Sequence, residues 1–345
     1  MLTHEISIVE TYHRLLAEDP DLTMPVAAIE ALILLLTQAA SSTVFETLDL
    51  LATQSNYLKS QVANPISLSA GTDLFQQYMI SSLKNTGVGN FETVRQHLLT
   101  NGRLFVSRAK AGRERIAGYG RHFIRDGSTV LTQGGSRVIG TLLSKAAEAN
   151  ASGGSIRFKV IYVMNDARSE ESNAIVSSLR AKGVPVATIS EGAVAYAMGK
   201  VDLVIVGAEG VVENGGIISR LGTYQIGLLA KAEGKPFYVA AESHKFVRLY
   251  PLGQYDLPIE QKVIDFKTTD TKTLTEEELK FMDRTPKVDE KTEYFTETAR
   301  SPLPRGANDA VDFTVSLTES LCTKSMLTSN SHLTSFLLSL LSREF

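Results

Sequence analysis

The chain of 345 residues is long enough to bury one large hydrophobic core or two medium ones. Hydrophobic residues make up 43% of it and charged residues 21%, which is ordinary for a globular protein, and the formal net charge of −3 predicts no direct binding to nucleic acid. A single cysteine, Cys322, excludes an intramolecular disulfide framework and is typical of a reducing compartment.

The sequence also carries no clear signal for a membrane or for secretion. The first ten residues lack the basic flank and apolar run of a secretory signal. The longest strongly apolar run, Val26–Leu36, contains Glu30 and is much shorter than the ~20 residues that a membrane span needs. We therefore expect a cytoplasmic protein with no membrane partner.

Residues 1–125 have the apolar spacing of helices and are predicted to form a helical amino-terminal domain. Pro25 lies near the start of one helical segment, where its missing N–H would have had no partner. Residues 71–83 and 90–124 show the same spacing. The second of these segments carries a run of basic residues, which is typical of a solvated helix face: Arg103, Arg108, Lys110, Arg113 and Arg115.

From residue 126 onward, short β-branched runs alternate with helical segments. The predicted strands are residues 128–132, 156–163, 184–189, 202–208 and 236–240. Near-continuous apolar strands separated by helices predict a mainly parallel sheet that is covered on both faces, so residues 126–345 are expected to form a Rossmann-like α/β domain. Such sheets place ligands outside the carboxyl ends of their strands.

Two stretches near the carboxyl terminus do not follow this pattern. Residues 265–309 are polar and charged, and we expect a surface excursion with a short helix near Glu276–Met282. Residues 315–345 form a tail in which the apolar run Phe336–Leu341 could make a terminal helix.

The first candidate site is the segment Leu131–Val138, in which a strand leads through Gly134 and Gly135 into a helix. Backbone N–H groups at the start of that helix, together with Ser136 and Arg137, could hold a phosphate. A simple tight turn is the alternative explanation of the two glycines.

The second candidate site follows the predicted strand 202–208. Glu209 and Glu213 could act as acids or bases, Asn214 could orient a hydroxyl, and Gly215 and Gly216 would let the backbone approach a ligand closely. The alternative is that the two glycines form a turn and that the glutamates are solvated.

A third candidate follows the last predicted strand, where Lys245 could reach a phosphate and His244 a proton. The histidines are otherwise scattered, and no cysteine pair is present, so the sequence predicts no metal site. It contains no Ser/His/Asp signature and no Walker loop, and no cofactor is expected.

Three long motifs resemble one known family. They are "RERIAGYGRHFIRDGSTVLTQGGSRV", "DLVIVGAEGVVENGGIISRLGTYQ" and "KPFYVAAESHKFVRLYPL". They are similar to the family of the alpha subunit of eukaryotic translation initiation factor 2B, and the resemblance extends from about Val26 to about Pro251. It implies a helical amino-terminal domain followed by a Rossmann-like α/β domain. The segment after Val311–Thr314 fits the family pattern poorly.

The family shares its fold with isomerases that act on methylthioribose 1-phosphate or ribose 1,5-bisphosphate. By this resemblance, the cysteine of the isomerases falls at about Gly134, their aspartate at Glu209, and their Asn-Lys pair at Ser219-Arg220. Glycine cannot move a proton, and such a contribution is commonly worth ~10²–10⁴-fold in rate. Glu209 is longer by one methylene and would misplace its carboxylate. We therefore predict no catalytic residue.

The resemblance implies a regulatory subunit of the guanine-nucleotide exchange complex for initiation factor 2. It would form a homodimer, bind the beta and delta subunits within a decamer, and help to sense the phosphorylated alpha subunit of initiation factor 2. Its pocket could still bind a sugar phosphate or a nucleotide, through residues that the two candidate loops and the third segment supply: Gly134, Gly135, Ser136, Arg137, Glu209, Asn214, Arg220 and Lys245. The alternatives are a sugar-phosphate isomerase and a free-standing metabolite-binding dimer.

Overall fold

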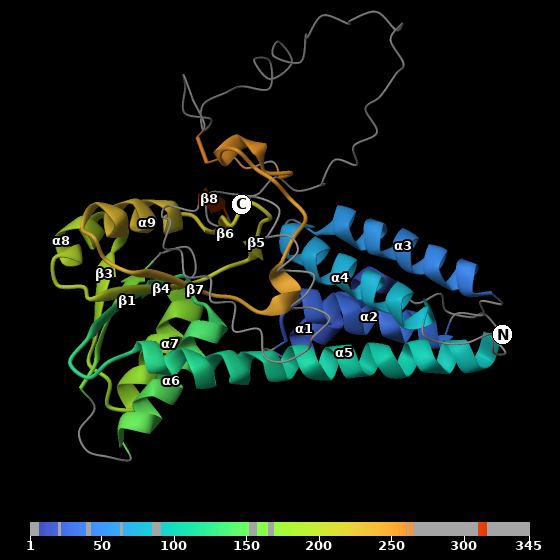
Figure 1. Cartoon of the computed structure of the whole chain (residues 1–345), viewed down its shortest axis with the longest axis horizontal. Coiled ribbons are helices and arrows are strands. Elements are labelled where there is room, and N and C mark those ends of the chain that lie inside the picture. Colours follow the sequence, from blue (N-terminus) through green and yellow to red (C-terminus); the bar gives the residue numbers. More distant parts are fainter. Residues whose placement is uncertain are drawn as a thin grey trace, which may run out of the picture.

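The computed structural model describes residues 7–19, 22–38, 43–62, 65–84, 91–151, 157–164, 169–259, 261, 263–264 and 310–315. The predicted surface excursion 265–309 with its helix near Glu276–Met282 lies outside these residues, as do Cys322, the apolar run Phe336–Leu341 and the rest of the tail beyond Val315. The molecule is elongated, with a bundle of helices at one end and an α/β unit at the other (Figure 1).

The helical end contains α1 (Ile8–Glu18), α2 (Met24–Gln38), α3 (Val44–Gln61), α4 (Pro65–Lys84) and the first half of α5 (Phe91–Gly120). Helix α2 is apolar on nearly every side and is buried by the others, as expected for such a sequence. Pro25 lies in its first turn, as predicted. Two other helices begin at side-chain caps, because Ser7 accepts from the N–H of Glu10 and Thr43 from that of Glu46.

Helix α5 runs through both ends of the molecule. Its 30 residues span about 45 Å at 1.5 Å per residue. Leu98 and Val106 pack in the core of the helical bundle, whereas Ala117 packs in a core beneath the sheet. The predicted solvated face of this helix is confirmed for Arg103, Arg108, Lys110 and Arg115, which are exposed, while Arg113 is half-buried.

The parallel sheet has the order β3-β2-β1-β4-β7. Its strands are β1 (Thr129–Gln133), β2 (Lys159–Met164), β3 (Val186–Ser190), β4 (Leu203–Gly207) and β7 (Phe237–Ala240), so each of the five predicted strands is confirmed within a few residues. Helices α6 (Arg137–Ala151) and α7 (Ser169–Ala181) cover one face, and α8 (Val194–Met198) and α9 (Thr223–Ala232) cover the other (Figure 1).

A second sheet of three antiparallel strands lies beside the first, in the order β5-β6-β8. It consists of β5 (Gly210–Val211), β6 (Ile217–Arg220) and β8 (Val311–Thr314). The sequence predicted only a loop between Glu209 and Gly216, because β5 is too short to show a periodic pattern. Ile66 and Ala70 of α4 pack against this sheet and so connect it to the helical end.

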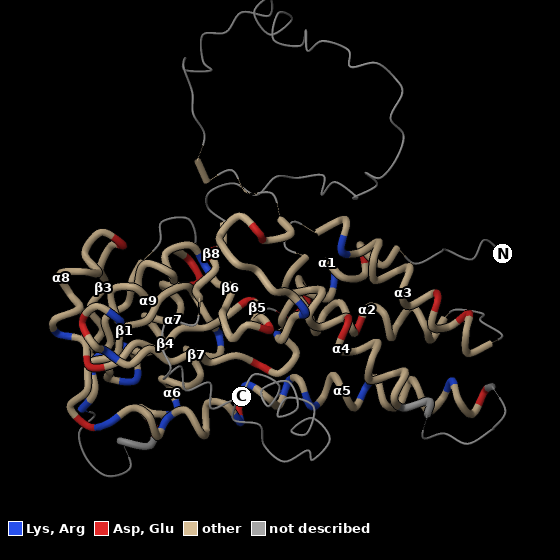
Figure 2. The backbone as a smooth tube through the Cα atoms, turned by 45° about the horizontal axis from the view of Figure 1, so that its top comes forward, with Lys and Arg blue, Asp and Glu red and all other residues tan. Residues whose placement is uncertain are grey.

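Four short 3₁₀ turns complete the described elements: η1 (Arg121–Phe123), η3 (Glu191–Ala193), η4 (Ser243–Lys245) and η5 (Gln254–Asp256). Basic and acidic residues are interspersed along the chain at both ends of the molecule (Figure 2). Among the described helices, none is both long and apolar enough to cross a lipid bilayer.

Candidate functional site

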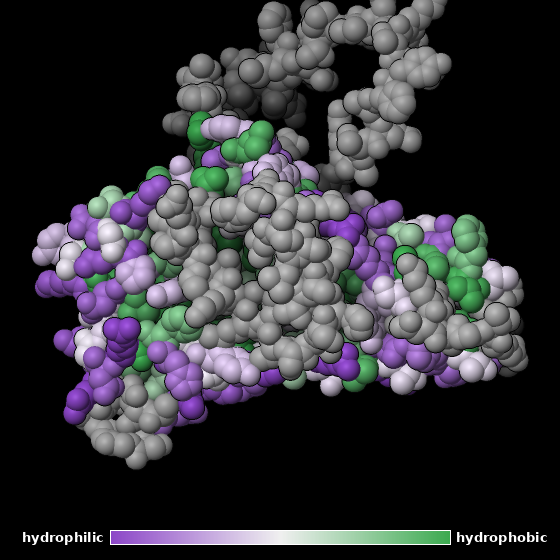
Figure 3. Space-filling view, in the orientation of Figure 1, coloured by the Kyte–Doolittle hydropathy of each residue, from purple (hydrophilic) through white to green (hydrophobic). Residues whose placement is uncertain are grey.

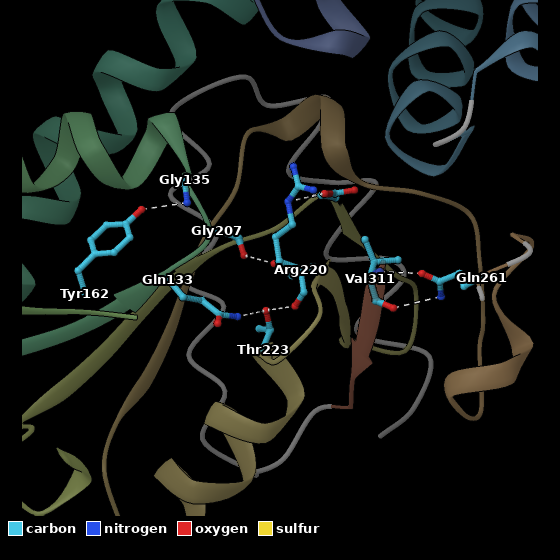
Figure 4. A network of polar contacts seen from close by, with 10 residues as sticks. Gln133, Gly135, Tyr162, Gly207, Arg220, Thr223, Gln261 and Val311 are labelled. Atoms are coloured by element: carbon cyan, nitrogen blue, oxygen red, sulfur yellow. Dashed lines mark hydrogen bonds and ion pairs between the residues drawn. The ribbon is translucent and has the colours of Figure 1, made fainter. Parts of the chain in front are cut away.

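The candidate site lies where β1 and β4 end side by side in the sheet (Figure 4). The strand order changes direction between these two strands, which is the position at which open α/β sheets bind ligands. After β1, Gly134 and Gly135 turn the chain into α6 with φ angles of 85° and 61°. The N–H of Gly135 donates to the Tyr162 hydroxyl at 2.9 Å. Both glycines therefore have a left-handed backbone that other residues rarely adopt.

Gly134 faces Arg220. A Cβ atom built on Gly134 would lie 3.3 Å from Cγ of Arg220, at a backbone φ of 85°. A larger side chain at this position would have to share the space that Arg220 occupies and would also strain the backbone. The position that the isomerase resemblance assigns to a cysteine is therefore crowded by an arginine in this chain.

The side chains of Glu209 and Arg220 form an ion pair in this crevice. Oε1 of Glu209 lies 3.2 Å from Nε of Arg220, and the two side chains are only 14% and 21% exposed. Glu209 follows β4, and Arg220 ends β6, so the β5–β6 hairpin brings them together. An anionic ligand that used Arg220 would have to compete with the carboxylate of Glu209.

A buried polar scaffold beneath this ion pair was not predicted from the sequence. Nε2 of Gln133 donates to the hydroxyl of Thr223 at 2.6 Å, and this hydroxyl donates to the carbonyl of Arg220 at 2.6 Å (Figure 4). The Ser219 hydroxyl donates to the carbonyl of Gly207 at 3.0 Å. These bonds fix the backbone of Arg220 relative to β1 and β4. The only sequence signal was a glutamine directly before the two glycines.

Ser136 and Arg137 take different directions from the same turn. Ser136 packs against Gly207 at the end of β4, because a Cβ built on Gly207 would lie 2.4 Å from the Ser136 hydroxyl oxygen. Arg137 is exposed, and its Nη1 donates to the carbonyl of Leu22 at 2.8 Å, so it reaches toward the helical end. Together with Lys145 and other residues, Arg137 lines a groove of about 560 Å³ between α5, α6 and α7. Arg137 is therefore not part of the Glu209–Arg220 pair.

Asn214 closes the β5–β6 hairpin. Its Nδ2 donates to the carbonyl of Pro251 at 2.7 Å, and its Oδ1 accepts from the N–H of Gly216 at 3.2 Å. Gly215 has a φ of 77°, and a Cβ on Gly216 would lie 2.5 Å from the Phe313 ring. The alternative in which the two glycines form a turn is thus the conformation observed. Glu213 is exposed, as that alternative expected, but Glu209 is only 14% exposed and ion-paired, which that alternative did not expect.

Lys245 is in the turn η4, and its Nζ lies 2.9 Å from Oε2 of the buried Glu242. Burial acts to raise the pKa of Glu242, but the charges of Lys245 and His244, together with hydrogen bonds from Lys245 and from the backbone, outweigh it and hold this pKa at about 2. His244 is 2% exposed, and burial lowers its pKa to about 4. The turn packs against α4 and α5. Glu242, His244 and Lys245 thus form a buried cluster between the helical end and the sheet, in which Lys245 is ion-paired with Glu242.

Asp312 in β8 is a second buried carboxylate that was not predicted. It is 5% exposed, and its Oδ2 accepts from the N–H of Tyr224 at 2.9 Å, at the start of α9. Burial raises its pKa to about 7, and the N–H groups of Tyr224 and of its neighbours Gly222 and Thr223 counteract part of this rise. Nothing in the local sequence indicates this role, because β8 meets α9 only in the folded chain. Across the residues that the structure describes, no group of three or more acids, histidines and cysteines could hold a metal ion.

The chain has a helical bundle that α5 joins to a parallel sheet, and a polar crevice lies where the strand order reverses. These features define a Rossmann-like α/β protein with a helical amino-terminal part. A sequence model of the initiation factor 2 subunit family matches residues 17–291. The chain is 36% identical to translation initiation factor eIF2B subunit alpha from Dictyostelium discoideum over 252 residues, which are 72% of this chain and 76% of that relative. The chain belongs to the initiation factor 2 subunit family.

Two further comparisons concern the fold and a partial similarity to an isomerase. The tetrameric eIF2B-beta2-delta2 complex from C. thermophilum contains a chain with a TM-score of 0.60 and 20% identity, which covers 73% of this chain and 85% of its own length. At this identity the likeness concerns the fold alone. The chain is also 35% identical to ribose 1,5-bisphosphate isomerase from Archaeoglobus fulgidus over 155 residues, which are 45% of this chain and 48% of that enzyme.

Proposed function

We propose that the chain is a non-catalytic regulatory subunit of the guanine-nucleotide exchange complex for initiation factor 2, of the alpha type and acting in the cytoplasm. Its similarity to an eIF2B alpha subunit over most of both chains supports this assignment. The proposal that the subunit is not catalytic is supported by the crevice, where Gly134 has no side chain and Arg220 holds the Glu209 carboxylate.

An aldose–ketose isomerase must move a proton between neighbouring carbon or oxygen atoms, which requires positioned acid and base groups. Glu209 is the acid in this crevice that follows β4, and its ion pair with Arg220 at 3.2 Å restricts its motion. The partial similarity to ribose 1,5-bisphosphate isomerase nevertheless makes this activity the alternative to test. Measurable turnover of ribose 1,5-bisphosphate or methylthioribose 1-phosphate by the purified chain would overturn the proposal.

We further propose that the crevice binds a sugar phosphate or a nucleotide. Arg220 supplies a guanidinium, and Ser136 and the backbone around Gly135 supply hydroxyl and N–H groups at the start of α6. Lys245 and Arg137 belong to neighbouring clusters, so they contribute charge to the surroundings of the crevice. Calorimetric titration with a panel of sugar phosphates tests this part, and the absence of heat at millimolar ligand would contradict it.

In the assembly that we propose, the chain forms a homodimer and binds beta and delta subunits within a decamer. The helical end would help to recognise the phosphorylated alpha subunit of initiation factor 2. Recognition would inhibit exchange by population shift, because the phosphorylated partner stabilises the arrangement of subunits that it binds preferentially. The 36% identity to an eIF2B subunit alpha over most of both chains supports the assembly.

Affinity purification of the tagged full chain from its own cells tests the assembly. We expect beta and delta subunits to co-purify in constant ratio, and the bound complex to retain exchange activity that falls when phosphorylated initiation factor 2 is added. A chain that purifies alone, without exchange factor subunits, would instead favour the free-standing metabolite-binding dimer.

A further inference from the structure

The groove of about 560 Å³ between α5, α6 and α7 is separate from the crevice, because neither Glu209 nor Arg220 lines it. Two rows of residues run along this groove, and within each row the residues are four positions apart, so they lie on one face of their helix. The rows are Gly140, Ser144 and Glu148 on α6, and Ala174, Ser178 and Lys182 on α7 and directly after it. The first two members of each row are small, so they leave the space between the helices open.

The side chains that line this groove carry more positive than negative charge. Its basic and acidic residues are Arg113, Arg137, Lys145 and Lys182, and Glu114 and Glu148. The groove therefore has an excess of two positive charges, although the whole chain has a formal net charge of −3. Mainly hydrophilic residues cover the surface around α6 and α7 (Figure 3). A local excess of one sign attracts groups of the opposite charge.

Two ion pairs in the groove join its helices. The Lys145 ammonium contacts the Glu114 carboxylate and also donates to the Glu114 carbonyl at 3.1 Å. Nζ of Lys182 lies 2.7 Å from Oε1 of Glu148. In each pair the carboxylate is the more exposed partner, since the glutamates are 61% and 63% exposed and the lysines 31% and 36%. Exposed pairs of this kind contribute little to stability, so an incoming carboxylate can replace the glutamates at the ammonium groups.

The basic groups are spread along the groove and are not gathered at one point. Arg137 and Lys145 are separated by two turns of α6, or about 12 Å at 1.5 Å per residue. Lys182 lies beside Glu148, nearly one turn further along α6. A single phosphate group could contact only part of this row. An extended peptide advances about 3.3 Å per residue, so several acidic residues in one peptide can reach all of it.

We propose that the groove between α5, α6 and α7 is a docking site for an acidic segment of a partner protein, whose carboxylates contact Arg137, Lys145 and Lys182. Glu114 and Glu148 compete with that segment for the two lysines, so they select for segments with enough negative charge to displace them. This inference goes beyond the proposed function. It concerns a surface outside the crevice and does not require the crevice to bind a ligand.

The double variant Glu114→Gln/Glu148→Gln of the full chain is the sharper test, because damage to the fold does not produce a gain of binding. Fluorescence anisotropy with a fluorescein-labelled oligoglutamate peptide should show roughly tenfold tighter binding than the wild type. The matched control is Glu10→Gln/Glu233→Gln, which removes the same charge from two exposed glutamates outside the groove and should bind like the wild type.

Two outcomes of this experiment would overturn the proposal. Equal gains in the groove variant and in its control would show that only the net charge of the chain matters. A wild-type chain that leaves the anisotropy of the peptide unchanged at its highest soluble concentration would show that the groove does not bind acidic segments. An uncharged oligoglutamine peptide of the same length should not bind, and equal binding of the two peptides would contradict recognition by charge.

The opposite change tests the lysines. Lys145→Gln/Lys182→Gln should weaken binding of the oligoglutamate peptide roughly tenfold. The matched control is Arg103→Gln/Arg108→Gln, which removes the same charge from an exposed part of α5 outside the groove and should bind like the wild type. A lysine variant with a native circular dichroism spectrum and unchanged affinity would refute the proposal. If this variant does not fold, the gain expected for the glutamate variant decides the question.

A crevice variant separates this proposal from the proposed function. Arg220→Gln removes the guanidinium of the crevice and should leave binding of the oligoglutamate peptide unchanged, because Arg220 does not line the groove. The same variant should weaken any binding of sugar phosphates. Loss of peptide binding in Arg220→Gln would place the acidic segment in the crevice and would overturn the groove assignment.

Discussion

The two sheets of this protein are stabilised in different ways. The parallel sheet is built from strands that are consecutive or nearly so, and its centre is apolar on both faces, with Leu131 and Val130 completely buried. The small sheet joins residues 210–220 to residues 311–314. It has an apolar core that includes Ile218 and Phe313, but several of its contacts with neighbouring segments are polar: Asp312 on α9, and Gln254 and Gln261 on β8. Hydrophobic burial is strong and insensitive to pH, whereas buried polar contacts make a sheet sensitive to single groups.

The largest expected effect is in the parallel sheet. Leu131→Ala removes a completely buried side chain from β1 and leaves a cavity, so the free energy of unfolding should fall by about 2–5 kcal/mol. Urea denaturation measures this loss. The control is Leu228→Ala on α9, whose side chain is 42% exposed and should change stability far less. Equal losses in the two variants would contradict the assigned core.

The second prediction concerns pH and the small sheet. The pKa of Asp312 is raised to about 7 in the folded chain, above its ordinary value of 3.8, so the folded state binds this proton more tightly than the unfolded state. Its contribution to stability is therefore complete below pH 4 and is lost as the pH rises toward 7 and above. Between pH 5 and pH 8 we expect a loss of roughly 2–3 kcal/mol from this group.

Asp312→Asn should remove this part of the pH dependence, which urea denaturation at several pH values can measure. The matched control is Asp202→Asn, because Asp202 is exposed and also accepts a backbone N–H, that of Thr129 at 2.7 Å. If the profiles of wild type and Asp312→Asn run parallel from pH 5 to pH 8, Asp312 is not the group responsible.

A third prediction tests how closely the two parts of the small sheet approach each other. Gly216→Ala would place a Cβ 2.5 Å from the Phe313 ring and should cost about 1–3 kcal/mol through overpacking. Hydrogen exchange should show the loss first in β6 and β8 and not in β1. The control, Gly112→Ala in α5, meets no atom within 4 Å and should be neutral or stabilising. Uniform loss of protection in both sheets would argue that they unfold together.

The smallest effect is expected at the ligand crevice. Glu209→Gln removes the charge that competes for Arg220, so inorganic phosphate and sugar phosphates should bind roughly tenfold more tightly, which corresponds to about 1.4 kcal/mol. Calorimetry measures this change, and Glu213→Gln on the exposed part of the same loop is the control. Weaker binding in Glu209→Gln would show that the carboxylate contacts the ligand directly.

Sequence patterns predicted the parts of the fold that depend on local periodicity. The five parallel strands and the helices around Pro25 and along residues 90–124 are confirmed because each contains enough residues to show its apolar period. β5 has two residues and β8 follows a polar stretch, so neither could show one. The sequence placed Gly134 and Glu209 at the same edge of the sheet, and in the structure they follow the neighbouring strands β1 and β4.

The polar partners of those residues could not be predicted in the same way. The Arg220 guanidinium reaches Glu209 only because a hairpin folds back over β4, and Gln133 meets Thr223 across 90 positions of sequence. Asn214, a candidate to orient a ligand hydroxyl, donates to the carbonyl of Pro251, 37 positions away in the sequence. Such pairings follow from tertiary geometry and leave no spacing pattern in the chain.

The single continuous helix α5 has a mechanical consequence. A helix of 30 residues without an internal break behaves as a stiff rod over a length of this kind, and it is anchored in two separate cores by Leu98 and Ala117. If the amino-terminal end of α5 tilts, its carboxyl-terminal end must move against α6. Helix α6 begins next to the turn that contains Gly134. Helix α5 therefore connects the helical end and the α/β unit mechanically. A partner that displaced one end would also displace the other.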